Sequence, residues 1–131
     1  MILLDTHALV WAAIEPRRLS RAAASAMRRA RHDDGLAIAA ISLWELASLF
    51  ARRRIESYGS VERSVRDVLQ AVGVSIRELT LEIAVLASQL PDDYPRDPAD
   101  RLIGATALAD GVPLITHDLQ IRQSTAVKTI W

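Results

Sequence analysis

Short apolar runs along the chain alternate with longer segments in which apolar residues recur every three or four positions. Continuous apolar runs predict buried strands at residues 2–4, 36–39, 74–76, 112–116 and 127–130. The helical period predicts helices over residues 7–14, 19–31, 43–54, 60–72, 80–90 and 98–111. Buried strands that alternate with helices predict an α/β fold with a central, mostly parallel sheet and helices on both faces.

Polar residues mark the starts of two of these helices. Ser42 is followed three residues later by Glu45, which is the capping-box spacing, so Ser42 is the predicted N-cap of its helix. Residues 91–98 form the clearest loop, and Asp97 is the predicted cap of the next helix because Pro98 follows it.

Length and composition narrow the range of functions. The chain has 131 residues, which predicts one domain over residues 1–131. It contains no cysteine, which excludes a disulfide scaffold, thiol catalysis and a cysteine zinc site. Its longest nearly uncharged apolar stretch, residues 35–44, is too short to span a bilayer, and its first residues lack a basic signal-peptide region. We therefore expect no membrane association and a cytoplasmic location.

Four acidic residues are predicted to meet at the carboxyl edge of the sheet. Asp5 directly follows the first strand, and Asp118 leaves the strand that ends at Thr116. Glu45 and Asp100 lie in the first turns of two helices that pack at the same edge. Carboxylates so placed repel one another unless a cation lies among them, and a hard ion such as Mg²⁺ or Mn²⁺ meets that need.

Each acid also has a purely structural explanation. Asp5 and Asp97 can serve as helix caps, and Glu45 can complete a capping box. Asp100 is favoured by the helix dipole, and Asp118 by turn chemistry. These roles are compatible with metal binding, and they do not explain why all the acids fall at one edge.

Four segments around these acids resemble the acidic motifs of PIN domains, and in particular the VapC-type ribonuclease toxins of bacterial toxin–antitoxin pairs. They appear in the family order and span nearly the whole chain. The segments are Ile-Leu-Leu-Asp-Thr-His at 2–7, Ser-Leu-Trp-Glu-Leu-Ala at 42–47, Asp-Pro-Ala-Asp-Arg-Leu-Ile-Gly-Ala-Thr-Ala at 97–107, and Leu-Ile-Thr-His-Asp at 114–118.

The resemblance implies a PIN-like three-layer fold with a sheet of about five strands. It implies that Asp5, Glu45, Asp100 and Asp118 form a catalytic set that binds Mg²⁺, with Asp97 as a supporting acid. It also implies an endoribonuclease toxin that hydrolyses RNA with a metal-activated water and so inhibits translation and growth. A VapB-type antitoxin and a homodimer are further expectations from the family.

Three nearby residues are assigned supporting roles. Thr6 and Thr116 are placed to hold carboxylates or metal-bound water through their hydroxyls. Arg101, next to Asp100, has three possible tasks: folding back on the carboxylates, touching the scissile phosphate, or forming a surface ion pair.

Alternative functions stay open at this point. A PIN-like fold with an idle metal site would bind RNA or a partner without catalysis. A haloacid-dehalogenase-like phosphatase also begins with Asp after the first strand, but the position two residues later, where it needs a second Asp, holds His7. A metal-independent ribonuclease would use two of the three histidines at positions 7, 32 and 117.

The zero net charge results from cancellation between two halves of the chain. Through residue 66 there are 11 basic and 7 acidic residues, and after it 5 basic and 9 acidic, so the halves carry about +4 and −4. Three consecutive arginines, Arg52 to Arg54, end a predicted helix. They complement the helix dipole, or they form a strip that follows phosphates.

Overall fold

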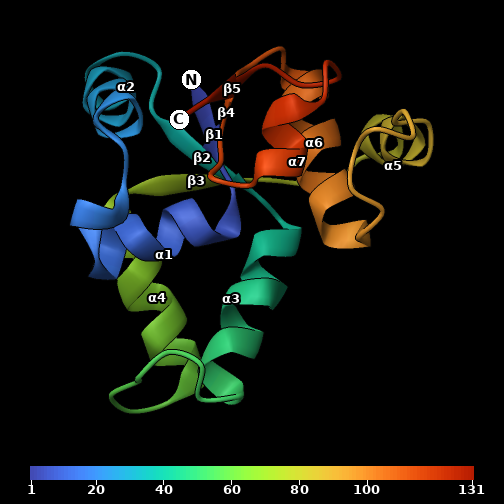
Figure 1. Ribbon diagram of the computed structural model, residues 1–131. Coiled ribbons are helices and arrows are strands. Elements are labelled where there is room, and N and C mark those ends of the chain that lie inside the picture. The colour runs from blue at the N-terminus through green and yellow to red at the C-terminus, as the bar shows by residue number, and fades with distance from the viewer.

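The computed structural model describes residues 1–131 and contains a five-stranded parallel sheet with helices on both sides (Figure 1). No helix is long and apolar enough to cross a membrane. In chain order the elements are β1 (Ile2–Leu4), α1 (Thr6–Ile14), the 3-10 helix η1 (Pro16–Arg18), α2 (Arg21–His32), β2 (Leu36–Ala39), α3 (Ile41–Ala51), α4 (Val61–Val72), β3 (Val74–Arg77), α5 (Leu81–Ser88), α6 (Pro98–Asp110), β4 (Leu114–Ile115), α7 (Leu119–Gln123) and β5 (Thr129–Ile130).

The strand order places β1 in the middle of the sheet. The order is β3-β2-β1-β4-β5, and every pair of neighbours is parallel. The chain moves outward from β1 to β2 and β3, then returns past β1 to add β4 on its other side. The order therefore reverses between β1 and β4, and parallel sheets place their ligand sites beyond the carboxyl ends of the strands at such a point.

Alternate strand residues enter two separate cores. Leu4 and Ile38 pack into the core beneath α1, α2, α3 and α4, whereas Leu3 and Ala37 pack into the core beneath α6 and α7. Helix α5 packs on the outer side of α6 through a smaller cluster that includes Ile83. Figure 1 shows these helix layers on the two sides of the sheet, which confirms the predicted three-layer α/β fold.

The predicted capping box at Ser42 and Glu45 is wrong. Helix α3 begins at Ile41, with Ala40 as a cap that makes no side-chain hydrogen bond. Ser42 lies inside the helix and is fully buried. Both Ser42 and Glu45 hydrogen bond with Thr6 of α1, so contacts between helices replace the local cap.

Other helix boundaries differ by a few residues. Helix α3 ends at Ala51 instead of residue 54, so the three arginines that follow lie beyond it. The short elements η1 and α7 have no counterpart among the predicted helices. Asp97 does cap α6, with Pro98 in the first turn, as the sequence predicts.

A close contact between Tyr94 and Gly104 fixes the loop before α6 against that helix. Tyr94 is fully buried, and its hydroxyl donates a 2.7 Å hydrogen bond to the carbonyl oxygen of Asp100. A Cβ atom at position 104 would lie 2.6 Å from Tyr94 Cζ and still closer to the hydroxyl oxygen. Glycine is required here because the ring passes directly over the helix backbone.

We predict that Gly104→Ala lowers the free energy of unfolding by about 1 to 3 kcal/mol, because the added methyl group displaces the Tyr94 ring. Helix propensity alone predicts the opposite sign, since alanine is favoured over glycine inside a helix by about 1 kcal/mol. Urea unfolding of both proteins distinguishes the two effects, and an unchanged or increased stability would contradict the packing argument.

Candidate active site

A cavity of about 570 Å³ opens at the carboxyl edge of the sheet, beside the point where the strand order reverses. We call it the acidic cavity. It is lined by Asp5, Thr6, His7, Trp11, Arg18, Glu45, Asp97, Asp100, Ile103, His117 and Asp118. All four acids of the predicted catalytic set, together with Asp97, are therefore brought to one cavity from distant parts of the chain.

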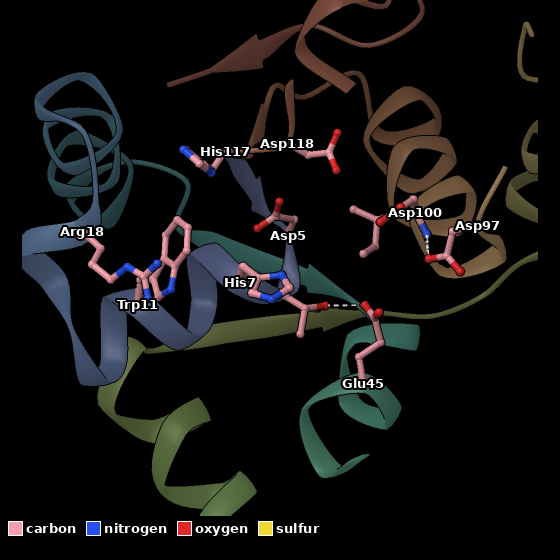
Figure 2. A pocket seen from close by; sticks show the side chains of 11 residues that line it. Asp5, His7, Trp11, Arg18, Glu45, Asp97, Asp100, His117 and Asp118 are labelled. Carbon is pink, nitrogen blue, oxygen red and sulfur yellow. Dashed lines mark hydrogen bonds between the residues drawn. The ribbon is translucent and has the colours of Figure 1, made fainter. Parts of the chain in front are cut away.

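Two acids occupy the ends of the adjacent strands β1 and β4. Asp5 follows β1 and caps α1, accepting a 2.7 Å hydrogen bond from the backbone N–H of Ala8. Asp118 lies beyond β4 and caps α7, accepting from the N–H of Ile121 at 2.9 Å. Each carboxylate therefore caps a helix and also lies in the cavity, where Figure 2 shows its position.

A hydroxyl from α1 holds the third acid. Thr6 Oγ1 lies 2.6 Å from the Glu45 carboxylate and 2.9 Å from the Ser42 hydroxyl. A hydroxyl has one proton, so Thr6 donates it to the carboxylate and accepts from Ser42. This chain of two hydrogen bonds fixes the start of α3 relative to β1 and orients Glu45 toward the cavity (Figure 2).

The first turn of α6 supplies the remaining two acids. Asp97 accepts a 3.4 Å hydrogen bond from the backbone N–H of Asp100. The Tyr94 hydroxyl donates to the carbonyl oxygen of Asp100. Hydrogen bonds to its N–H and its carbonyl therefore fix the backbone of Asp100, while its side chain lies in the cavity (Figure 2).

Burial and mutual repulsion both destabilise the charged forms of Asp5 and Asp100 in the cavity. Burial raises the pKa of Asp5 above its usual range, against the opposing effect of hydrogen bonds with Thr116 and the Ala8 N–H. Burial also raises the pKa of Asp100 to about 7, with further contributions from Asp97 and Asp118. The metal-free cavity thus holds excess negative charge that a bound cation would relieve.

The supporting residues differ in where they lie. Thr116 is buried, and its hydroxyl accepts from the backbone N–H of Asp118 at 3.1 Å. Arg101 is absent from the cavity lining, because its guanidinium donates to the carbonyl oxygens of Ala87 and Leu90. Arg101 forms neither the expected surface ion pair nor a contact with the cavity carboxylates, and it ties the end of α5 to α6.

The predicted catalytic and supporting set omitted five residues of the lining: His7, Trp11, Arg18, Ile103 and His117. The two histidines were considered only for a metal-independent mechanism. His7 and His117 lie within two residues of a predicted catalytic acid, and that proximity was a usable signal. Trp11 and Arg18 carry no local signal, because they reach the cavity only when α1 and η1 pack against the end of the sheet.

The donor chemistry of the cavity fits a hard divalent cation. Carboxylate oxygens are the ligands that Mg²⁺ and Mn²⁺ prefer. No group of three or more acidic or histidine side chains is arranged closely enough to hold an ion by direct contact. Mg²⁺ commonly binds through one or two carboxylates and keeps several waters, and a cavity of about 570 Å³ has room for such a hydrated ion.

The sheet is all-parallel, and carboxylates gather at the point where its strand order reverses. The protein is therefore an α/β protein with an acidic site at the carboxyl ends of its strands. The sequence pattern of the PIN domain matches residues 2–125, and the chain belongs to this family. It is 40% identical to Ribonuclease VapC22 of Mycobacterium tuberculosis over 134 residues, covering 99% of this chain and 98% of that protein.

Solved structures share the fold at lower sequence identity. VapBC2 from Rickettsia felis, bound to a DNA fragment from its promoter, matches with a TM-score of 0.73 and 16% identity, covering 98% of this chain and 97% of that one. FitAcB from Neisseria gonorrhoeae matches with a TM-score of 0.69 and 20% identity, covering 98% and 96%. These likenesses confirm the α/β architecture.

We predict that Asp100→Asn stabilises the metal-free protein at high pH. The pKa of Asp100 is about 7 in the folded protein, whereas in the unfolded chain it has its ordinary value of 3.8, so wild-type stability falls as pH rises between these values. Asp100→Asn has no group that titrates at this position, so it does not lose this stability. Above pH 7 its free energy of unfolding should exceed that of wild type by on the order of 1 to 3 kcal/mol.

Urea unfolding in EDTA at pH 5 and pH 8 measures this difference. Asp92→Asn, which removes an exposed carboxylate outside the cavity, is the matched control; it keeps Asp100, so its stability should match that of wild type at both pH values. Equal stability of Asp100→Asn and wild type at pH 8 would refute the electrostatic account.

Proposed function

We propose that the protein is the Mg²⁺-dependent endoribonuclease toxin of a VapBC-type toxin–antitoxin pair, acting in the cytoplasm on RNA to inhibit translation and growth. The main observation in support is the gathering of Asp5, Glu45, Asp100 and Asp118 in one cavity. The 40% identity to Ribonuclease VapC22 along almost the whole chain supports the same activity.

Asp5, Asp100 and Asp118 are the proposed ligands of the metal, directly or through bound water, with Glu45 completing the set and Mn²⁺ as a possible substitute. A bound divalent cation would neutralise charge on the phosphate and lower the pKa of an attacking water. Asp5 is the anchor of this set, since it is the most buried of the acids and is fixed by the Ala8 N–H.

The remaining residues orient these groups. The Thr6 hydroxyl directs one oxygen of Glu45, which leaves the other free to accept the proton of the attacking water. Thr116 holds the backbone at Asp118, and Asp97 holds the first turn of α6. Arg101 supports the site indirectly by fixing α5 against α6.

We predict that Asp5→Asn lowers RNA cleavage at least about 100-fold while the protein stays folded, because an amide cannot replace the charge of a metal ligand. Cleavage of total RNA, followed by sequencing of the new ends, measures the effect. Wild-type activity should disappear in EDTA and return with Mg²⁺, and the products should carry 5′-phosphate ends.

Asp92→Asn is the control for loss of one negative charge and should cleave like wild type. Activity that survives complete chelation would favour the histidine-based mechanism. A folded wild-type protein that binds RNA but cleaves none in Mg²⁺ or Mn²⁺ would favour a PIN-like binding protein with an idle site.

We further propose a VapB-type antitoxin and a homodimeric state. Support for the antitoxin comes from fold neighbours that were solved as toxin–antitoxin complexes, including one from Klebsiella pneumoniae. An acidic cavity is also a suitable receptor for an arginine side chain of a partner, which would compete with the metal for the carboxylates.

We predict that expression of the wild-type chain alone arrests growth, whereas Asp5→Asn does not. Coexpression with a small protein encoded beside this chain should restore growth, and the two should copurify. Light scattering of the purified chain tests the dimer. Equal growth arrest by wild type and Asp5→Asn would contradict toxicity through catalysis.

A further inference from the structure

Arg18 is the single arginine or lysine among the residues that line the acidic cavity. It lies on the side opposite Asp97 and Asp100 (Figure 2). Its ion pair with Glu15 is long, at 3.9 Å, and both side chains are about half exposed, so this pair holds the guanidinium only weakly. Arg18 is therefore available to a negatively charged ligand in the cavity.

A cluster of aromatic rings positions Arg18. Its guanidinium carbon lies 4.4 Å from the ring centre of Trp11, which is 9% exposed. The ring of Trp11 in turn packs against those of His117 and Trp131, at 5.4 and 5.8 Å between centres. The N–H donors of arginine lie at the edge of the guanidinium plane, so stacking on a ring leaves them free to bind phosphate.

A second cavity, of about 270 Å³, continues from the acidic cavity between α1 and α3. We call it the arginine groove. It shares Thr6, His7 and Glu45 with the acidic cavity. Its other lining residues are Trp44, Ser48, Leu49, Arg52 and Arg54.

The arginine groove follows one face of α3 and the turn after it. Glu45, Ser48 and Arg52 are spaced three and four residues apart, which places them along one side of the helix and its end. None of the ion pairs of the structure involves Arg52 or Arg54. Both guanidinium groups are thus exposed, uncompensated cations that face a groove leading to the carboxylates.

We propose that a single-stranded segment of RNA crosses the acidic cavity, with a phosphate on one side of the cleaved bond held by Arg18 and phosphates on the other side held by Arg52 and Arg54. This strand path rests on the proposed ribonuclease function. Five carboxylates in the cavity repel a phosphate backbone, and cations at both ends of the path offset that repulsion. Contacts on both sides of the reacting phosphate suit cleavage inside a strand.

Binding measurements on a catalytically inactive background test the path. Arg18→Ala and the double change Arg52→Ala/Arg54→Ala are placed in Asp5→Asn, and the probe is a labelled RNA of about 20 nucleotides that spans a cleavage position mapped with the wild-type protein. Each should weaken binding about tenfold, and the salt dependence of log K should fall by about one for Arg18→Ala and about two for the double change.

Neighbouring arginines provide matched controls. Arg17→Ala removes the same charge from the same turn as Arg18, and Arg53→Ala removes it between Arg52 and Arg54; neither residue lines a cavity of the path. Both should bind the RNA like the parent protein. The strand path would be overturned if Arg18→Ala or the double variant bound the RNA as tightly as the parent protein. It would also be overturned if the controls lost as much affinity for the RNA.

Shortened RNAs test whether the two arginine sites lie on opposite sides of the cleaved bond. Removing the nucleotides on one side should abolish the effect of one arginine change and preserve the effect of the other. If shortening the RNA on one side removed the effects of both arginine changes, or of neither, the two-sided path would be overturned. Wild-type protein that cleaves RNA while the arginine variants bind normally contradicts this path alone, whereas absence of any RNA cleavage contradicts the proposed function itself.

Discussion

The burial of Asp5 at the end of the central strand is the constraint on which the site depends. A carboxylate in this position is costly to charge, and its raised pKa reflects that burial. The N–H of Ala8 at the start of α1 offsets part of the cost, because the capped end of a helix favours negative charge. The same residue therefore follows β1, caps α1 and places a carboxyl group beside the end of β4.

Much of this arrangement could be predicted from the sequence because its causes are local. Apolar runs define β1 and β2, and a strand followed at once by Asp5 predicts both a helix cap and a side chain at the carboxyl edge. Asp97 before Pro98 predicts the start of α6 and so places Asp100 one turn later. Once the strands are taken as parallel, these acids must lie at the same edge of the sheet.

What the sequence did not predict depends on contacts between distant segments. The spacing of Ser42 and Glu45 is typical of a capping box, yet the Thr6 hydroxyl, 36 and 39 residues away, binds both side chains and α3 begins earlier. Arg101 likewise follows a proposed catalytic acid, Asp100, in sequence but donates to carbonyl groups at the end of α5. In each case a tertiary hydrogen bond outweighs a local preference.

The same packing explains how a chain of zero net charge can accommodate the polyanion proposed as its substrate. The excess of arginine lies in the first half of the chain, and η1 and the turn after α3 carry Arg18, Arg52 and Arg54 to the rims of the two cavities. The excess of acid lies in the second half, and α6 carries part of it to the far wall of the acidic cavity. The sheet order pairs β1 of the first half with β4 of the second, so these opposite charges line the acidic cavity and the arginine groove that continues from it. On the proposed strand path a phosphate backbone would meet cations before and after the carboxylates, and a bound metal ion would supply the positive charge between them.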